Sequence, residues 1–500
     1  MMGGDMKSKC RWVALGAVLV SRALGFTVDA LPTHAVFYPG EEAQPCLRIR
    51  IEAQAGEKLS QVVCSAGGST ARAVSAAYLY RSDVPYFSLH AQPAVAAVKV
   101  AASSGVHDAM VFKTKDVELA DGENWFWLVY DVPRTAKGGD KICGELKSAT
   151  DGSGVQVKPA KGRAGLHRAD GKTAAVPGEV YPFQYRIAPY VRPKWACRHN
   201  ADMFTAAHLK NMTDFIVFGY THSGTALAAA KDAEMNGKDY SDKCLALARK
   251  LRGAGKARIL AGFSCNEAKN PMAAIMHDDA KRRVLVRNMA ALVLEKGYEG
   301  IDIDWEYPRE SGRFKPFATW RKLALFLGEL RAELAGTGAS LSVAVTTRYD
   351  APNAEVLDGV DFINSMSYGR PGEHATKEAA RDDVEYLLKR QVPPAKIVLG
   401  LPFFSRDTKR KHDDGGGCGY SAIVKWFPNL PAGRNTFKHP DTGEMHYFNG
   451  ADLIRDKCKT FVLQRKIGGV CIWAYDTDVP INHAKSLSKA LYSVIRQTKR

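Results

Sequence analysis

Apolar and polar residues alternate over short runs in the first third of the chain. From residue 27 to about 158, these runs are separated by Gly, Asp, Ser and Pro. A period of two is typical of strands that bury one face, and frequent turn residues favour short connections between them. The pattern predicts an N-terminal β-sandwich-like domain over residues 27–158, with its clearest strands in LRIRIEAQ, KVAAS, AMVFKTKDVEL and WFWLVYDV.

The pattern changes twice after this domain. Residues 159–190 are rich in Lys, Gly, Ala and Pro, which is typical of a linker. From residue 191 to 500, strand-like apolar runs alternate with stretches that carry apolar residues at helical spacing, such as VRNMAALVLEKG and WRKLALFLGELRAELAG. The predicted strands are KWACRH, DFIVFGY, ARILAGFS, GIDIDWEY, LSVAVTT, DFINSMSYG, KIVLGLPFF and GGVCIWAYD.

Eight strands alternating with helices over about 300 residues predict an α/β fold, a parallel (β/α)8 TIM barrel. A doubly wound open sheet is the alternative. It is disfavoured because no GxGxxG sequence follows the first predicted strand.

The first 25 residues are typical of a secretory signal peptide. Lys7, Lys9 and Arg11 precede the apolar run WVALGAVLV, and small residues follow it. This run is too short to span a bilayer, and no other stretch reaches 18 apolar residues. We therefore expect a secreted protein without a membrane span.

The ten cysteines do not suggest a metal site, because no CxxC and no Cys/His cluster is present. We expect neither metal nor cofactor. Cys10 would leave with the signal peptide. Three cysteines of the first domain are candidates for one disulfide whose pairing the sequence leaves open: Cys46, Cys64 and Cys143. Cysteines within the predicted barrel strands are expected to be small buried apolar groups: Cys197, Cys265 and Cys471.

The formal net charge of +17 raises the possibility of nucleic-acid binding. The basic residues are spread along the chain, with only short clusters such as Lys409-Arg410-Lys411, and no nucleic-acid-binding motif accompanies them. We therefore expect a solvated basic surface, no nucleic-acid partner, and a monomer.

The segment YEGIDIDWEYP carries the candidate chemistry. Asp302, Asp304 and Glu306 occupy every second position, and side chains two apart on a strand share one face at a spacing of about 6.6 Å. The alternate residues are apolar and would face the surrounding helices. The three acids are thus predicted to point into the barrel, with Glu306 nearest the C-terminal mouth, where barrel enzymes place their chemistry.

Carboxyl groups crowded in a dry space cannot all ionise, so at least one pKa rises. A carboxylic acid that stays protonated near neutral pH can donate its proton to a glycosidic oxygen as that oxygen leaves. The alternative is an exposed edge strand whose acids face water. Ile301, Ile303 and Trp305, which alternate with the acids, disfavour it.

GIDIDWEYP resembles the DxxDxDxE signature of glycoside hydrolase family 18, the chitinases and their relatives. The resemblance covers about 300 residues, from Lys194 to the C-terminus. Its other landmarks follow in order: Met366-Ser367-Tyr368 resembles the MxY element of strand six, KIVLGLPFF resembles strand seven, and GGVCIWAYD resembles strand eight with its tryptophan, Trp473.

The resemblance implies hydrolysis of β-1,4 bonds in chitin or other N-acetylglucosamine-containing glycans by substrate-assisted catalysis, an exception to the two-carboxylate scheme. Glu306 would protonate the leaving oxygen while the substrate's N-acetyl oxygen attacks the anomeric carbon. Asp304 would orient the acetamide and stabilise the oxazolinium charge, and Asp302 would share a proton with Asp304. Tyr368 would hydrogen-bond the acetamide oxygen, and Trp473 would form an apolar floor beneath the sugar.

Tyr307 and Met366 complete the implied substrate-binding residues. A strand tyrosine or tryptophan is, on residue type alone, more often core packing than a sugar contact. The functional roles of Tyr368 and Trp473 therefore rest on the resemblance.

The sequence departs from the family pattern at three places. Glu299 replaces the first Asp of the signature. The SxGG element of strand three is absent, with Ala261 and Phe263 in place of Ser and Gly. The Asp that follows the MxY tyrosine is Gly369, and losing a transition-state partner of this kind costs on the order of a few kcal/mol.

These departures leave two alternatives. One is a catalytically weak or inactive, lectin-like chitin-binding protein. The other is an endo-β-N-acetylglucosaminidase that acts on N-linked glycans. The intact Glu306 and Asp304 favour a hydrolase.

The role of the first domain is also open. Trp125 and Trp127 lie on one face of a predicted strand. Exposed, they would stack on sugar rings as in a carbohydrate-binding module, and buried, they would belong to the core. We expect core positions.

Overall fold

The computed structural model describes residues 25–89, 96–106, 108–159, 178–198, 205–265, 272–304, 316–347, 359–409 and 417–495. The predicted signal peptide therefore lies outside the described residues, except for its last residue. No described helix combines the length and the apolar character needed to cross a bilayer.

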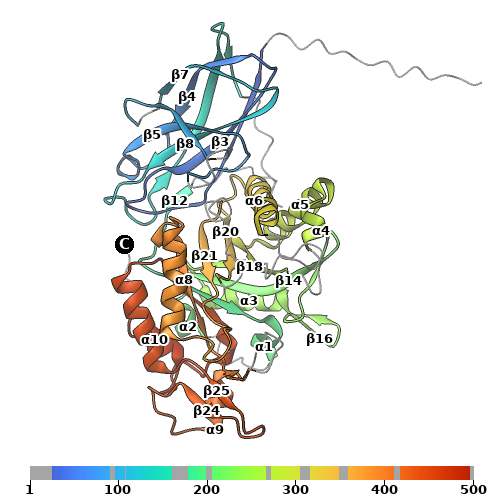
Figure 1. Ribbon diagram of the computed structural model, residues 1–500, viewed down its shortest axis with the longest axis vertical. Helices are drawn as coiled ribbons and strands as arrows, with labels where there is room; N and C mark the ends of the chain where they lie inside the picture. The colour runs from blue at the N-terminus through green and yellow to red at the C-terminus, as the bar shows by residue number, and fades with distance from the viewer. Residues whose placement is uncertain are drawn as a thin grey trace, which may run out of the picture.

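The N-terminal region is built from antiparallel sheets, as the alternation predicts, and is β-sandwich-like (Figure 1). One sheet has five strands in the order β1 (Thr27–Pro32), β3 (Gln44–Ala53), β8 (Gly122–Asp131), β5 (Ala76–Ser82) and β6 (Val98–Ala102). The other has four, in the order β11 (Gln156–Val157), β10 (Glu145–Asp151), β4 (Lys58–Ser65) and β7 (Met110–Glu118).

Strand β8 is buried on both faces. Phe126, Leu128 and Tyr130 join the core between the sheets, whereas the alternate residues face the other way. Trp125 and Trp127 are on this second face and are buried, at 9% and 3% exposure. The expectation of core positions is confirmed in that both are buried, although they lie outside the core between the two sheets.

Eight parallel strands form a closed barrel, because β13 pairs with both β26 and β14. Around the barrel the strands are β13 (Arg186–Val191), β26 (Gly469–Trp473), β22 (Ile397–Pro402), β21 (Phe362–Ser365), β20 (Ser340–Val345), β19 (Gly300–Asp304), β18 (Arg258–Ser264) and β14 (Asp214–Ser223). The predicted (β/α)8 barrel is confirmed.

Helices pack around the barrel (Figure 1). They are α1 (Pro193–Arg198), α2 (Ala206–Leu209), α3 (Ser241–Arg252), α4 (Met272–Met276), α5 (Asp279–Lys296), α6 (Pro316–Glu333), α8 (Lys377–Lys389), α10 (Ala451–Lys457), the π-helix η4 (Cys458–Gln464) and α11 (Leu487–Tyr492). The predicted end of α5 is confirmed: Gly297 follows it in the left-handed conformation, at φ 69°.

Small additions lie outside the barrel. Strand β15 (Ala226–Ala229) pairs antiparallel with β14, and β16 (Glu234–Met235) pairs with β17 (Lys238–Asp239). Between β22 and α10 lie α9 (Tyr420–Trp426) and a three-stranded sheet of β23 (Arg406–Asp407), β25 (Met445–Tyr447) and β24 (Thr436–Lys438).

The predicted first barrel strand, KWACRH, is wrong. Residues 194–198 belong to helix α1, which starts at Pro193, a favourable residue for the first turn because it needs no hydrogen-bond acceptor. The first strand is β13, at the end of the predicted linker, and all of its residues are buried. Its Arg186 and Pro189 conceal the strand pattern, because their burial depends on tertiary partners. Cys197 consequently lies on a helix, whereas Cys471 lies on β26 as predicted.

The sandwich packs against the amino ends of the barrel strands. Tyr38 donates a hydrogen bond to the carbonyl of Asp361, just before β21, at 2.5 Å, and accepts one from Arg186 at 3.1 Å. A small sheet of β2 (Val36–Phe37), β12 (Gly178–Val180) and β9 (Lys141–Ile142) leads into Tyr181, which donates to Asp214 at the start of β14 (2.9 Å).

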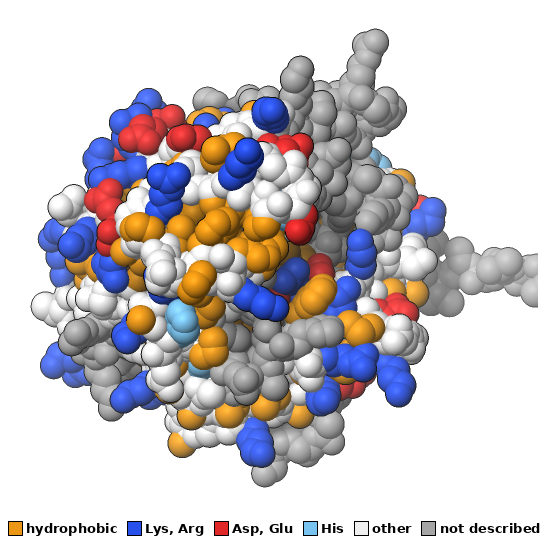
Figure 2. All heavy atoms as spheres, turned by 90° about the horizontal axis from the view of Figure 1, so that it is seen from below, with side chains coloured by type: hydrophobic (Ala, Val, Ile, Leu, Met, Phe, Trp, Pro, Cys, Tyr) orange, Lys and Arg blue, Asp and Glu red, His pale blue; other side chains and the backbone are white. Residues whose placement is uncertain are grey.

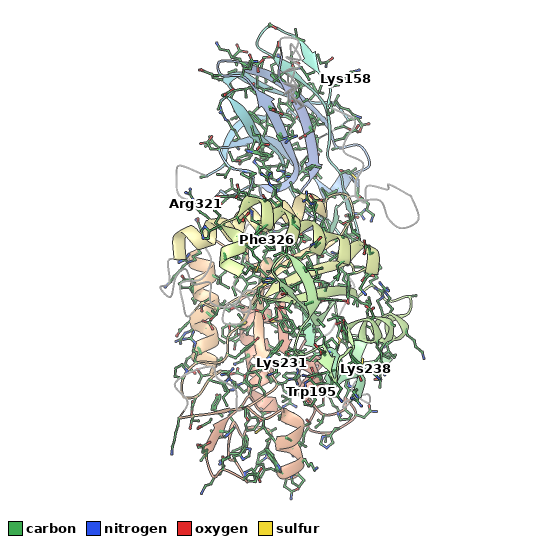
Figure 3. All side chains as sticks on the ribbon, turned by 90° about the vertical axis from the view of Figure 1, so that its right-hand side faces the viewer. Lys158, Trp195, Lys231, Lys238, Arg321 and Phe326 are labelled. Atoms are coloured by element: carbon green, nitrogen blue, oxygen red, sulfur yellow. The ribbon has the colours of Figure 1, made fainter. Side chains whose placement is uncertain are left out.

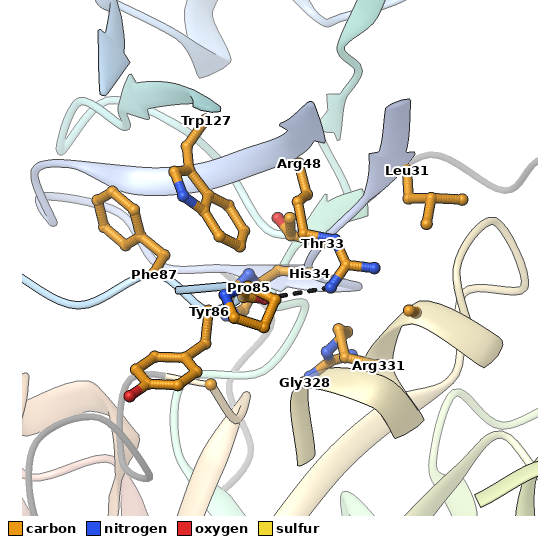
Figure 4. A pocket seen from close by; sticks show the side chains of 12 residues that line it. Leu31, Thr33, His34, Arg48, Pro85, Tyr86, Phe87, Trp127, Gly328 and Arg331 are labelled. Atoms are coloured by element: carbon orange, nitrogen blue, oxygen red, sulfur yellow. Dashed lines mark hydrogen bonds between the residues drawn. The ribbon is translucent and has the colours of Figure 1, made fainter. Parts of the chain in front are cut away.

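A second part of this junction lies beside α6 (Figure 4). Trp127 and Arg48 come from the sandwich, with Arg48 donating to the carbonyl of Pro85 at 3.1 Å, and Gly328 and Arg331 come from α6. The cavity between them is only about 30 Å³. Phe326 lies on the same helix, directly below the sandwich (Figure 3).

All nine cysteines in the described residues are free thiols. The Cys46 thiol interacts electrostatically with those of Cys143 and Cys64. A disulfide within this group stays a prediction.

Candidate active site

Asp302 is fully buried in the barrel interior. It accepts hydrogen bonds from the Tyr190 hydroxyl (2.8 Å), the Ser342 hydroxyl (2.5 Å) and the Asn364 amide nitrogen (3.0 Å). Asn364 also donates to the Tyr190 hydroxyl at 2.9 Å. The donors come from β13, β20 and β21, so this network joins four strands across the interior.

Burial raises the pKa of Asp302 from 3.8 to about 6, against the three donors, which favour the ionised form. The carboxyl group therefore holds its proton at a higher pH than an exposed aspartate does. This property fits a group that shares a proton with a neighbouring acid.

Asp304 is the last residue of β19 and lies nearer the carboxyl end of the barrel, with 7% of its surface exposed. Burial and then the charge of Asp302 raise the pKa of Tyr190 well above its usual value, with further contributions from Asp304 and Tyr368. Tyr190 thus stays protonated in the middle of these groups and remains a hydrogen-bond donor. Ile301 and Ile303, which alternate with the acids, pack into the helix layer.

Tyr368 and Met366 follow β21 at the same end of the barrel, and both are half-buried. The Tyr368 ring contacts Phe404 edge-on, with centroids 5.9 Å apart. A Cβ at Gly400 of β22 would lie 2.8 Å from the Tyr368 ring, so the absence of a side chain there makes room for the tyrosine.

Trp473 is the last residue of β26 and is half-buried. Its indole packs edge-on against Phe218 and Tyr190, with ring centroids 4.9 and 5.6 Å apart. The peptide bond between Trp473 and Ala474 is cis. The two ring contacts fix the indole at the barrel mouth, beside Tyr190, which donates a hydrogen bond to Asp302.

The backbone at Gly369 differs from an ordinary strand. Its φ is 76°, in the left-handed region that favours glycine, and its N–H donates to Nδ1 of His374 at 3.3 Å. Burial lowers the pKa of His374 to about 3, so the ring is neutral and can accept this bond. The next residue, Arg370, forms an ion pair with Asp383 at 2.5 Å.

The other two departures from the family pattern lie away from the acids. Glu299 precedes β19 at the amino end, where it pairs with Arg252 (2.6 Å) and accepts from the N–H of Ile259 (2.9 Å). Ala261 and Phe263 of β18 belong to the core between the barrel and its helices. Glu299, Ala261 and Phe263 therefore take no part in the hydrogen bonds that the described residues make to Asp302.

Among the described residues, the structure brings together four predicted site residues, Asp302, Asp304, Tyr368 and Trp473, and places Met366 at the same end of the barrel. Glu306 and Tyr307 lie outside the described residues.

The sequence interpretation missed Tyr190, Ser342 and Asn364. Asn364 lies two residues before Met366 and four before Tyr368, so its place on the same strand face was a usable signal. Tyr190 was hidden in the predicted linker.

Figure 2 looks onto the end of the barrel that carries α9, β24 and β25, where the strands end. Hydrophobic side chains gather around a hollow in this face, and lysine and arginine side chains outnumber acidic ones on the surrounding surface. Among the described residues no group of three or more His, Cys, Asp or Glu has the arrangement of a metal site.

Comparison with known proteins gives one matching family model, described as glycosyl hydrolases family 18, over residues 186–478. The chain is 22% identical over 335 residues to a protein named Probable chitinase 2 from Drosophila melanogaster, covering 55% of this chain and 68% of the fly protein. It is 26% identical over 241 residues to Chitinase 1 from Aphanocladium album, covering 39% of this chain and 55% of the fungal protein.

Solved structures share the barrel fold. A chitinase from Bacteroides thetaiotaomicron superposes with a TM-score of 0.52 at 21% identity, over 62% of this chain and 96% of that one. A plant class V chitinase mutant from Cycas revoluta, in complex with (GlcNAc)3, gives 0.50 at 16% identity, over 62% and 99% of the two chains.

Proposed function

This chain belongs to glycosyl hydrolase family 18, and on that premise we propose that it is a retaining glycosidase that cleaves β-1,4 bonds in N-acetylglucosamine polymers such as chitin. The observation that carries the proposal is the buried, hydrogen-bonded Asp302 next to Asp304 at the end of β19, with Tyr368 and Trp473 at the same mouth. The names of the fly and fungal relatives and the (GlcNAc)3 complex of the plant chitinase support the substrate class.

In the proposed reaction, Glu306 donates a proton to the glycosidic oxygen and the substrate's acetamide oxygen attacks the anomeric carbon. The bond to the leaving sugar breaks, and a cyclic oxazolinium forms without a covalent bond to the enzyme. Water, deprotonated by Glu306, then opens the ring from the face that the leaving group occupied, so configuration is retained.

Asp304 orients the acetamide and stabilises the positive charge that develops on it. Asp302 takes up a proton from Asp304 when that charge forms, and its raised pKa, of about 6, suits it to this exchange. Tyr190, Ser342 and Asn364 hold Asp302 in place throughout.

The test is product analysis by mass spectrometry after incubation with chitohexaose. Wild type is expected to release shorter N-acetylglucosamine oligomers, and Glu306→Gln is expected to release none, because the amide has no proton of suitable acidity to donate. Glu295→Gln is the matched control, since it removes a carboxylate from the exposed face of α5. Equal activity of wild type and Glu306→Gln would contradict the assignment of the acid.

Gly369 favours a second candidate, a glycan-binding protein without turnover. The family's aspartate at this position is missing, and the backbone here has a conformation that favours glycine. Binding of chitohexaose by wild type without any cleavage would support this second function. If chitohexaose is neither bound nor cut, release of N-glycans from a glycoprotein would instead identify an endo-β-N-acetylglucosaminidase.

We also propose that the chain is exported, on the basis of its first 25 residues. Expression of the full chain in a secreting host and N-terminal sequencing of the protein in the medium test this. A mature protein that starts near residue 26 is expected, and retention of the intact chain inside the cell would contradict export.

A further inference from the structure

Two cysteines far apart in the sequence meet beside the barrel. Cys197 lies on α1 and Cys244 on α3, and these two helices pack against each other. Cys244 belongs to the apolar cluster of the barrel and Cys197 packs against that cluster, and the two thiols are close enough for each to shift the pKa of the other. Because the Cβ atoms of a disulfide are about 3.5–4.5 Å apart, two neighbouring thiols on packed helices need little backbone movement to become linked.

The two thiols differ in access and in acidity. Cys244 is buried and Cys197 is half-buried, so a small reagent meets Cys197 first. The neighbouring Cys244 thiol and the charge of Lys243 lower the pKa of Cys197. Burial instead raises the pKa of Cys143 and Cys418, the other half-buried cysteines. A thiolate is the nucleophilic form of cysteine, which makes Cys197 the more reactive of these three.

We propose that Cys197 and Cys244 are a redox-active pair that closes to a disulfide between α1 and α3 on reaction with a low-molecular-weight disulfide. The Cys197 thiolate attacks one sulfur of the reagent, whose S–S bond breaks and releases one thiolate. Cys244 then loses its proton and attacks the Cys197 sulfur of this mixed disulfide, releasing the second half of the reagent. The protein dithiol is oxidised, and the reagent is reduced to two thiols.

The location gives this bond a structural consequence at the barrel mouth. Helix α1 begins two residues after β13, which carries Tyr190. Between them, Arg192 pairs with Asp476, three residues beyond Trp473, at 2.6 Å. The disulfide would tie this segment covalently to α3.

The far side of α1 is held by the additions outside the barrel. Lys194 donates to the carbonyl of Lys231 at 2.7 Å, and Trp195 of α1 lies on the same side of the molecule as Lys231 and Lys238 (Figure 3). The disulfide therefore connects a segment that already contacts Asp476 and Lys231.

The experiment uses the full-length protein, purified under reducing conditions and then incubated with oxidised glutathione. Remaining thiols are alkylated, and the protein is digested with trypsin without reduction. We expect the peptides 195–198 and 244–249 as one linked species, lighter than their sum by two hydrogens. Recovery of both peptides in alkylated form, or of 195–198 carrying glutathione, would overturn the proposal.

Variants separate the two steps. Cys244→Ala is expected to stop at the mixed disulfide on Cys197, and Cys197→Ser is expected to leave Cys244 alkylated. Cys418→Ser is the matched control and should leave the linked species unchanged. Because the wild-type digest alone decides whether the bond forms, the result does not depend on the folding of any variant, nor on whether the chain cleaves chitin.

Discussion

Asp302 shows how a single buried acid is fixed by groups from the rest of the barrel. Its carboxylate oxygens accept three hydrogen bonds, and these bonds satisfy the donors that face them. Asp302 itself has no surface exposed to solvent. The same burial opposes ionisation, because a charge in a low-dielectric interior is costly. The site therefore holds an acid that is well oriented but expensive to ionise.

Replacement of this acid is expected to separate stability from activity. The folded protein binds a proton at Asp302 between about pH 4 and pH 6, where the unfolded chain has released it, because the folded pKa of about 6 lies above 3.8. The contribution of Asp302 to stability therefore falls as pH rises through this window. Asp302→Asn removes that pH-dependent cost and should raise the free energy of unfolding at pH 7 by about 1–3 kcal/mol.

Urea unfolding of both proteins at pH 4 and pH 7 measures this effect. The difference should be near zero at pH 4 and appear by pH 7, while activity on chitohexaose falls by roughly 100-fold or more. If Asp302→Asn gained less free energy of unfolding over wild type at pH 7 than at pH 4, the raised pKa of Asp302 would be contradicted. Ser342→Ala is a useful comparison, since it removes one donor but leaves the carboxyl group.

At the scale of elements, the amino end of the barrel is closed by a polar contact between two domains. Arg186 of β13 and Asp214 of β14 are buried and lie 2.5 Å apart. The guanidinium group lies over the rings of Tyr181 and Phe362, at 4.1 and 3.7 Å from their centroids. Tyr38 from the sandwich completes the contact, and its hydroxyl joins Arg186 to the backbone carbonyl of Asp361, just before β21.

Loss of the Tyr38 hydroxyl is expected to destabilise the whole chain. Tyr38→Phe leaves a guanidinium N–H and the carbonyl of Asp361 without this partner in a buried position, at a cost of about 1–3 kcal/mol. Thermal unfolding measures the loss. Tyr80→Phe is the control, since the Tyr80 hydroxyl makes no hydrogen bond among the described residues. Since Tyr38 lies at the opposite end from the mouth, KM for chitohexaose should not change, and a raised KM would contradict this separation.

At the scale of the molecule, the sandwich covers the amino end of the barrel while the candidate site opens at the carboxyl end (Figure 1). Tyr86 of the sandwich region belongs to the same apolar cluster as the barrel core. The sandwich is thus a structural partner of the barrel, in contact with its core, and it does not line the described site.

Such a junction predicts that the two domains unfold together. Calorimetry of the intact protein should give one transition, and a chain that starts at Gly178 should melt several degrees lower or aggregate, because the buried faces of Tyr181 and Arg186 become exposed. Two separate transitions in the intact protein would contradict the prediction. The same truncated chain, if folded, should still bind chitohexaose.

The sequence by itself determined the features that depend on local periodicity. Alternation at Asp302 and Asp304 placed both acids on one face of one strand, and the helical spacing with its terminal Gly297 located the end of α5. The repeated strand–helix order then predicted the closed barrel, since neighbouring residues alone set these patterns.

Only the tertiary structure decided which distant groups meet. Tyr190 lies 112 residues before Asp302, in a strand whose Arg186 and Pro189 obscure its pattern, and no local signal connects the two. The same holds for the contact of Cys197 with Cys244 and for the end of the barrel that the sandwich covers. These contacts depend on the closure of the barrel and on the burial of charge against specific partners, and periodicity along the chain carries no information about either.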